Sequence, residues 1–318
     1  GARVTVVERH DRAGGLLMYG IPNMKLEKNV VTRRVELMRE LGIEFRLGVD
    51  ASDAAVASAL RDEFDAVVVA AGACKPRGLA AVGYDEGLAA GGVAYAVDYL
   101  TSATRSVLDG GAPAIDATGK DVVVIGGGDT GNDCLGTAVR QGARSVRQFE
   151  FLSCPPEERA AGDAWPQWPN VKKTDYGQVE AIDLMGGEMR EWGVDTLEVL
   201  FDEDGGVRGL RVVDLDWSHG KPERVEGSER EVPAQLVLIA CGFTGPEASV
   251  VEAFGAKIAE KGRPLPVMAT AGSHRTAASV AGKLVFAAGD ARNGSTLVVT
   301  AMADALACAA EVAATLGL

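Results

Sequence analysis

Three glycines in the middle of the chain have the spacing of a turn that binds a dinucleotide. Gly126, Gly128 and Gly131 form a G-x-G-x-x-G pattern, and residues 122–125 before them are all β-branched. Such a run is typical of a buried parallel strand, and residues 133–140 have the character of a helix. In this arrangement the first glycine allows the tight turn, the second lets the backbone approach a pyrophosphate, and the third lets helix and strand pack closely. The pattern predicts a nucleotide site at the helix N-terminus, although a glycine-rich turn that binds nothing has the same spacing.

Polar residues stand around this turn where a nicotinamide dinucleotide would meet them. Asp129 and Thr130 lie inside the motif, and Glu150 comes near the end of the strand-like run 145–151. A carboxylate at that place accepts hydrogen bonds from a ribose 2′-OH and repels a 2′-phosphate. We therefore expect NADH rather than NADPH. Two alternatives stay open, since Glu150 could be a solvated strand end and Arg147 could turn towards a phosphate.

The first residues have the pattern of the second half of another nucleotide-binding unit. Residues 3–9 indicate a strand with the acid Glu8 near its end, and Gly14 and Gly15 precede an apolar run at 16–22. Paired glycines followed by apolar residues suit a loop along a flat cofactor, with an ordinary glycine turn as the alternative. The strand, glycine turn and helix that ought to come first are missing from the sequence. We therefore expect a fragment of a longer protein.

Three later strands end in small residues, which let a backbone come near a ligand. Residues 65–72 end in Gly72, residues 236–242 end in Gly242, and residues 284–290 end in Gly289 and Asp290. Strands of this type in two parts of the chain indicate two nucleotide-binding domains.

The remaining periodic segments complete the expected architecture. Helices are expected at 28–41, 54–60, 91–109 and 297–316, and antiparallel strands at 195–201, 207–215 and 230–232. In the first helix the inward positions are expected to be Val31, Val35, Leu37, Met38 and Leu41.

Composition excludes several classes of partner and site. The net charge of −13 argues against nucleic acid or an anionic membrane surface, and no apolar run is expected to reach the length of a membrane span. The five cysteines are scattered without a C-x-x-C pair, so a redox dithiol, a zinc site or an iron–sulfur site within this chain is not expected. Cys134 and Cys308 are expected to be small core residues. The odd cysteine count suits a reducing cytoplasm.

Four runs of residues resemble the small (β) subunit family of glutamate synthase. They are 15–26 (GLLMYGIPNMKL), 124–133 (VIGGGDTGND), 165–169 (WPQWP) and 174–177 (TDYG). The resemblance implies an α/β protein with two Rossmann-like dinucleotide-binding domains, the NAD(P) domain being inserted into the FAD domain. The expected boundaries are 1–100 for the first part of the FAD domain, 101–249 for the NAD(P) domain and 250–318 for the second part of the FAD domain.

The resemblance also implies an activity. Reduced nicotinamide would give hydride to FAD, and electrons would pass through iron–sulfur clusters to a flavin on a large subunit. Glutamate would form there from 2-oxoglutarate and glutamine-derived ammonia. Hydride transfer requires two stacked rings at close range rather than an acid, base or nucleophile from the protein, so no catalytic residue is expected. No metal ligand is expected either, since the cysteines lack the spacing of a metal site.

The cofactor contacts implied by the resemblance fall into two sets. The FAD set is Glu8, Gly14, Gly15, Leu16, Gly72, Gly289, Asp290, Thr296, Leu297 and Val298. The nicotinamide set is Gly126, Gly128, Asp129, Thr130, Gly131 and Glu150.

The chain departs from this family in two ways. The N-terminal iron–sulfur domain and the first FAD glycine motif are missing, and residues 293–296 are Asn-Gly-Ser-Thr where the family tends to have Arg-Gly-Gln-Ser. Two alternatives remain. One is a related reductase with another acceptor such as ferredoxin, and the other is a non-catalytic module that has lost FAD.

Overall fold

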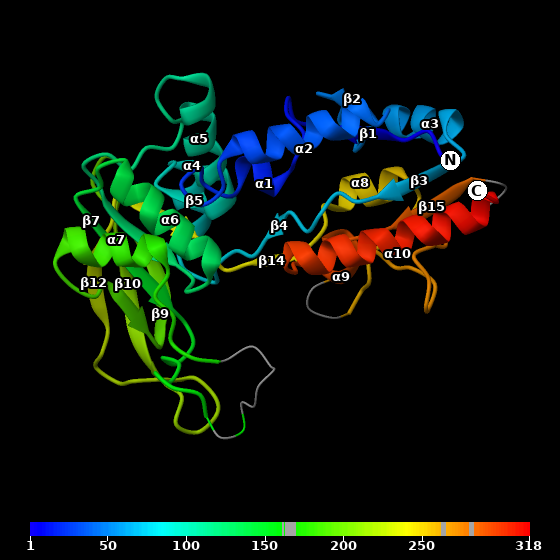
Figure 1. Ribbon diagram of the computed structural model, residues 1–318. Coiled ribbons are helices and arrows are strands. Elements are labelled where there is room, and N and C mark those ends of the chain that lie inside the picture. The colour runs from blue at the N-terminus through cyan, green and yellow to red at the C-terminus, as the bar shows by residue number, and fades with distance from the viewer. Residues whose placement is uncertain (161, 163–169, 262–264, 280–282) are drawn as a thin grey trace. The chain divides into compact units, whose positions relative to one another are not determined.

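The chain forms two compact units, each built from segments that are not contiguous in the sequence. The computed structural model describes residues 1–160, 162, 170–261, 265–279 and 283–318, so the WPQWP run lies outside the described residues. Unit 1 contains residues 1–18, 28–77 and 242–318, and unit 2 contains residues 19–27 and 78–241. In Figure 1 unit 1 therefore combines the blue elements from the start of the chain with the orange and red elements from its end.

A five-stranded parallel sheet is the centre of unit 2, with strand order β5-β13-β6-β7-β8. Its strands are β5 (Val93–Tyr95), β6 (Asp121–Ile125), β7 (Ser145–Glu150), β8 (Arg190–Trp192) and β13 (Leu236–Ile239). Both faces of this sheet are covered. In β6, Val122 and Val124 pack among helical residues, whereas Val123 and Ile125 face a second, antiparallel sheet. Burial on both faces explains why this strand is a continuous β-branched run rather than an alternating one.

Helices cover one face of the parallel sheet. They are α5 (Ala96–Asp109), α6 (Asp129–Arg140) and α7 (Tyr176–Met185), and the short α4 (Tyr84–Ala89) also belongs to unit 2. A capping box begins α7: the Asp175 side chain accepts from the first helical N–H groups, and the Gln178 side chain accepts from the Asp175 N–H.

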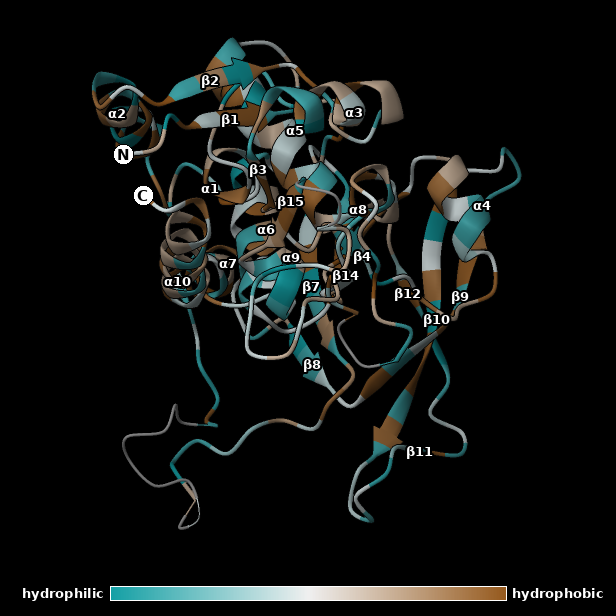
Figure 2. Ribbon diagram, turned by 90° about the vertical axis from the view of Figure 1, so that its right-hand side faces the viewer, coloured by the Kyte–Doolittle hydropathy of each residue, from teal (hydrophilic) through white to brown (hydrophobic). Residues whose placement is uncertain are grey.

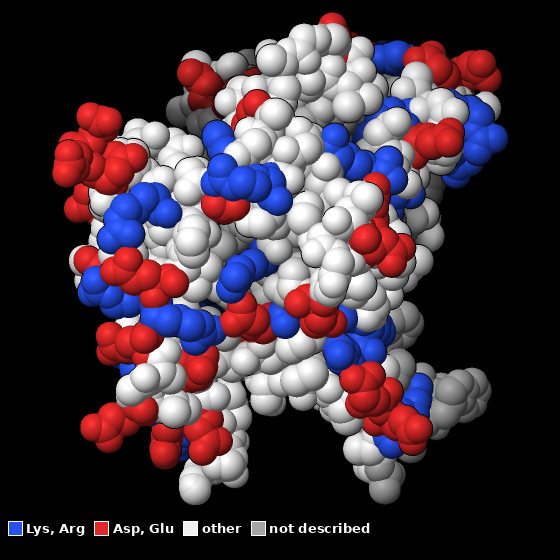
Figure 3. Space-filling view, turned by 90° about the vertical axis from the view of Figure 1, so that its left-hand side faces the viewer, with Lys and Arg blue, Asp and Glu red and all other residues white. Residues whose placement is uncertain are grey.

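The antiparallel sheet covers the other face and confirms the strands expected there. It consists of β9 (Val194–Phe201), β10 (Val207–Asp216), β11 (Glu223–Arg224) and β12 (Arg230–Pro233). Brown and teal segments alternate along β10 in Figure 2, as expected for a strand with one buried face. On the face of the molecule shown in Figure 3, cationic and acidic side chains are interspersed. The pair Arg211–Glu198, with an N–O distance of 2.6 Å, is one of the ion pairs on this sheet.

Unit 1 contains two separate pairs of parallel strands. β1 (Thr5–Glu8) pairs with β2 (Glu44–Leu47), and β3 (Ala66–Val69) pairs with β15 (Leu284–Ala287). One core cluster joins them, since Val7 of β1 packs with Val67 and Val69 of β3 and with Val285 of β15. A short antiparallel pair, β4 (Lys75–Pro76) and β14 (Phe243–Gly245), completes the strands.

The helices of unit 1 differ from the expected packing at one place. They are α2 (Lys28–Glu40), α3 (Ala54–Glu63), α8 (Ala248–Ala253), α9 (Asp290–Asn293) and α10 (Val298–Leu316), and the short α1 (Leu16–Tyr19) ends where the chain enters unit 2. Val31 of α2 is buried as expected. Leu37 and Met38 of α2 are exposed instead, because the described residues cover only part of its apolar stripe. Leu41 is also exposed, since α2 ends at Glu40.

The segment 91–109 also requires correction. Val93–Tyr95 is a strand rather than the start of a helix, because it pairs in parallel with β13. Residues 78–100 belong to compact unit 2. The chain passes from one compact unit to the other after Met18, Glu27, Arg77 and Cys241. The domain boundaries expected after residues 100 and 249 stay predictions.

α10 contradicts the expectation that no apolar run could span a membrane. The helix has 19 residues and is apolar enough, by length and composition alone, to cross one. Its charged residues, Asp304 and Glu311, nevertheless accept hydrogen bonds from groups of unit 1, and Cys308 between them is buried. One side of α10 is therefore fastened to unit 1 by polar contacts.

Candidate functional site: a glycine turn in unit 2 and a strand edge in unit 1

The turn between β6 and α6 depends on glycine at two of the three motif positions. Gly126 has a φ of +121°, and a Cβ built on it would lie 2.4 Å from the carbonyl oxygen of Ala240. A Cβ on Gly131 would lie 2.3 Å from the carbonyl oxygen of Gly126. Both distances are too short for any side chain, so these glycines are required for the tight turn and for packing of helix against strand.

Gly128 is different, because the space beside it is open. It is the N-cap residue of α6, and a Cβ built on it would meet no described heavy atom within 4 Å. A glycine that the fold itself does not require leaves room for a group to approach the backbone. The free N–H groups of the first turn of α6 point towards such a group, which favours an anion.

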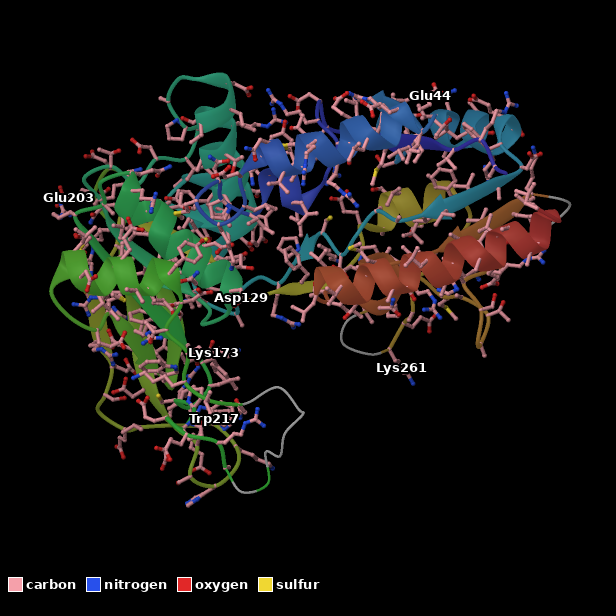
Figure 4. The ribbon with its side chains drawn as sticks, in the orientation of Figure 1. Glu44, Asp129, Lys173, Glu203, Trp217 and Lys261 are labelled. Carbon is pink, nitrogen blue, oxygen red and sulfur yellow. The ribbon has the colours of Figure 1, made fainter. Side chains whose placement is uncertain are left out.

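Asp129 and Thr130 form the first turn of α6. Asp129 is exposed, and Figure 4 labels it at the beginning of this helix. The nicotinamide set is thus brought together around one turn, with Glu150 at its side.

Glu150 holds two backbone groups at the carboxyl end of β7. Its Oε2 accepts from the N–H of Gly127 at 2.6 Å, and its Oε1 accepts from the N–H of Leu152 at 3.0 Å. The carboxylate is therefore fixed against the glycine turn rather than free in solvent. Each carboxylate oxygen has a second lone pair, so the group can still accept from a ligand hydroxyl.

Behind the turn, a polar cluster that the sequence analysis missed holds α6. Asp133 is 5% exposed, and its Oδ1 accepts from the Tyr176 hydroxyl at 2.7 Å and lies 3.4 Å from the Lys25 ammonium nitrogen. Burial raises the pKa of Asp133, although Tyr176 and Lys25 oppose that shift. Burial, followed by the hydrogen bond to Asp133, raises the pKa of Tyr176. The sequence signal for this cluster was an acidic residue, Asp133, at the start of the apolar helix that follows the glycine motif.

The FAD set lies in unit 1, and part of it shares the carboxyl edge of one strand pair. Val69 of β3 is opposite Ala287 of β15, so the glycines that follow the two strands emerge at the same edge. Gly72 has a φ of +75° and Gly289 a φ of +64°, which favours glycine at both positions.

Asp290 organises the chain that leads into α10. Its Oδ1 accepts from the Thr296 N–H at 3.1 Å and from the Thr296 hydroxyl at 2.7 Å. Leu297 and Val298 follow at the start of α10, with 65% and 46% of their surfaces exposed. The two apolar side chains are thus available to a flat apolar ligand at a helix N-terminus.

The remaining members of the FAD set belong to the first segment of unit 1. The Oε1 of Glu8 accepts from the His10 N–H at 2.9 Å. Gly14 has a φ of +126°, and a Cβ on it would lie 2.8 Å from the Cγ1 of Val31. Gly15 has a φ of +52°, and Leu16 is 45% exposed at the start of α1.

The Cys74 thiol lies near charged side chains of unit 1. Burial raises the pKa of the Cys74 thiol, and the charges of Arg9, Glu247, Glu8 and Asp290 also act on it. Arg9 and Glu247 form an ion pair with an N–O distance of 2.7 Å. Glu8 and Asp290 therefore share one electrostatic neighbourhood in unit 1.

A second missed cluster fastens Gly289 to α10. The Oδ2 of Asp304 accepts from the Gly289 N–H at 2.7 Å, and its Oδ1 lies 2.7 Å from Arg292 and 3.1 Å from His274. Burial alone would raise the pKa of Asp304, but the hydrogen bonds from Gly289 and His274 and the charge of Arg292 lower it. Ser273 and His274 likewise lower the pKa of Glu311 to about 2.

Among the residues that the structure describes, no group of three or more His, Cys, Asp and Glu side chains is placed to hold a metal ion.

Comparison with known proteins agrees with the α/β architecture. The sequence pattern of the family described as "Pyridine nucleotide-disulphide oxidoreductase" matches residues 1–305. FprA of Mycobacterium tuberculosis superposes with a TM-score of 0.72 at 16% identity, covering 99% of this chain and 78% of that one. Thioredoxin reductase of T. acidophilum superposes with a TM-score of 0.59 at 18% identity, covering 97% and 89%. These likenesses confirm the predicted fold class.

The similar sequences carry one kind of name. The chain is 42% identical to the glutamate synthase [NADPH] small chain of Bacillus subtilis, over 98% of this chain and 62% of that protein. It is also 42% identical to glutamate synthase [NADH] of Schizosaccharomyces pombe, over 98% of this chain and 15% of that protein. The chain thus spans less than two thirds of the length of these relatives. It is a homologue of glutamate synthase small chains and belongs to the pyridine nucleotide-disulphide oxidoreductase family.

Proposed function

We propose that this chain is the reductase part of a glutamate synthase small subunit, which moves electrons from a reduced nicotinamide through FAD. The observation that carries the proposal is the open space beside Gly128, at the start of α6 and next to the fixed carboxylate of Glu150. The 42% identity to a small chain of this enzyme supports the same assignment. The electrons would serve the formation of glutamate from glutamine and 2-oxoglutarate on a large subunit.

The described residues fit both cofactors. In unit 2, Gly128 and the first N–H groups of α6 would hold the pyrophosphate, and Glu150 would accept from the ribose. In unit 1, Gly72 and Gly289 leave backbone accessible, Asp290 would bind the ribityl–phosphate portion of FAD, and Leu297 would lie under its ring. Bound FAD supplies the ability to accept a hydride and to release electrons one at a time. The protein residues position and shield the two rings, because the transfer itself needs no acid or base from them.

The finer assignments are part of the same proposal. We assign NADH as the preferred donor because a 2′-phosphate would stand beside the carboxylate of Glu150. An iron–sulfur domain of the full-length protein would carry the electrons to the large subunit. All five cysteines are free thiols, which supports a reducing compartment such as the cytoplasm.

A flavin absorbance experiment tests the proposal. The purified chain is mixed with FAD, desalted, and titrated with NADH under anaerobic conditions. We expect retained flavin whose absorbance bleaches on addition of NADH. Flavin that is retained but bleached by neither NADH nor NADPH would contradict the electron path. Loss of all flavin on desalting would contradict FAD binding by this chain.

A further inference from the structure

One peptide group of the glycine turn is held from both sides by β7. The carbonyl oxygen of Gly126 accepts from the Gln148 Nε2 at 2.8 Å, and the N–H of Gly127, which belongs to the same peptide group, donates to Glu150 at 2.6 Å. Gln148 and Glu150 are two residues apart on one strand, so their side chains leave the same face. The plane of this peptide group is therefore fixed by two side chains, directly before the residue with the open space.

The amide of Gln148 is held in turn by a second buried amide. Its Oε1 accepts from the Gln178 Nε2 at 3.0 Å, and the Gln178 Oε1 accepts from the Asp175 N–H at 3.0 Å. Gln148 is 1% exposed and Gln178 is 5% exposed. The direction of these hydrogen bonds is unambiguous, because rotating either side-chain amide by 180° would set its NH2 group against another N–H donor. The capping box of α7 thus fixes which end of Gln148 faces the glycine turn.

The same helix is fastened to α6 by backbone contact. The N–H of Gln178 donates to the Asn132 Oδ1 at 3.0 Å. A Cβ on Gly177 would lie 2.4 Å from the carbonyl oxygen of Asn132, so α7 approaches α6 more closely than any side chain would allow. Tyr176 and Lys25 reach the next residue of α6, Asp133. The runs 15–26 and 174–177 therefore both contribute side chains that contact α6, the helix that follows the glycine turn.

We infer that Gln148 and Gln178 are positioning residues for the nicotinamide site, acting through the Gly126–Gly127 peptide group. This inference rests on the proposed function, since it assumes that a dinucleotide binds at the turn. A turn that is held rigid before binding loses less freedom when the ligand arrives, so the pair raises affinity without touching the ligand. A purely structural pair would change stability and leave the affinity of the folded protein unaltered.

Two variants test the inference in the 318-residue chain. Gln148→Leu removes the donor to Gly126. Gln178→Glu keeps an oxygen for the Asp175 N–H but cannot donate to Gln148. Thr137→Val is the matched control. The Thr137 hydroxyl is also buried in α6, and it donates to the carbonyl oxygen of Asp133 at 2.7 Å. It takes no part in the hydrogen bonds of Gln148 and Gln178.

Three readouts are needed: the Kd for NADH, the melting temperature, and hydrogen exchange at the amide of Gly127 in the ligand-free protein. We expect both glutamine variants to bind NADH about tenfold more weakly, which corresponds to about 1.4 kcal/mol of binding free energy. We also expect the amide hydrogen of Gly127 to exchange faster in both. Thr137→Val should lower the melting temperature and change neither of the other two.

The results separate the inference from the proposed function. Unchanged Kd values and unchanged Gly127 exchange in the folded glutamine variants would overturn the inference while NADH binding by the parent chain stands. If the parent chain does not bind NADH, the proposed function fails. The exchange measurement then still decides whether the two glutamines hold the turn.

Discussion

The open space beside Gly128 leads to a substitution that separates ligand binding from folding. Gly128 has a φ of −79° and a ψ of −176°, an extended backbone that any residue can adopt. An alanine methyl group would meet no described heavy atom within 4 Å. We therefore expect Gly128→Ala to change the free energy of unfolding by less than about 1 kcal/mol. The weaker N-cap preference of alanine is offset by the lower entropy of the unfolded chain.

The same methyl group would stand where a pyrophosphate approaches the backbone. Displacing the phosphate would lose or lengthen about one charge-assisted hydrogen bond from an α6 N–H, which is worth about 2 kcal/mol. The Kd for NADH should therefore rise about 30-fold. Gly131→Ala is the matched comparison, because its Cβ would lie 2.3 Å from the Gly126 carbonyl oxygen and 2.5 Å from the Gln148 Nε2. Overpacking of this kind costs about 1–3 kcal/mol of stability.

Thermal melts and fluorescence titrations with NADH on both variants distinguish these effects. Gly128→Ala should melt near the parent temperature and bind weakly, whereas Gly131→Ala should melt well below it. If Gly128→Ala binds NADH as tightly as the parent chain, no pyrophosphate approaches the turn at this residue. If it melts as low as Gly131→Ala, the space beside Gly128 is not open.

Three further substitutions address specificity, pH dependence and the core. Glu150→Arg should shift the ratio of Kd values towards NADPH, and equal ratios in the variant and the parent would refute the role of this carboxylate. The pKa of Glu311 is lowered from 4.5 to about 2, so its contribution to stability is present above about pH 4.5 and is lost as the pH falls towards 2. The melting temperatures of the parent and Glu311→Gln should therefore differ above about pH 5 and converge near pH 2; a constant difference would contradict this. Tyr99→Phe should cost only about 1 kcal/mol in urea unfolding, because the Gln141 Oε1 keeps its hydrogen bond from Ala117 when the Tyr99 hydroxyl is removed. A loss of more than about 3 kcal/mol in the free energy of unfolding would contradict this reasoning, because it would exceed the contribution of one such hydrogen bond.

The parts of the fold that could be predicted are those with a local signal. The β-branched run at 122–125, the glycine spacing and the following helix all lie within a few residues, and the structure confirms this strand, turn and helix. The antiparallel strands could be predicted because their alternation reflects one buried face. Cys134 and Cys308 are buried, as their apolar helical surroundings indicated.

The parts that were missed depend on partners far away in the sequence. Val93–Tyr95 is too short to distinguish a strand from a helix until β13, more than a hundred residues later, pairs with it. The role of Gln148 depends on Gln178, which no local pattern connects to it. Contact of the cofactors with the nominated residues remains a prediction, because it depends on ligands as well as on the fold.

The exchange of segments between the units has a consequence for the order in which the chain can fold. Residues 78–241 of unit 2 are contiguous, and all five strands of its parallel sheet lie among them. Unit 1 depends on the pairing of β3 with β15, which joins Ala66 to Leu284 across the whole intervening sequence. Closing so long a loop is slow, and domains generally form as units during synthesis. The sheet of unit 2 can therefore form on the ribosome while β3 still waits for its partner strand. Until β15 emerges, the edge of β3 stays unpaired. During this stage of synthesis the chain is most open to mispairing and to capture by chaperones.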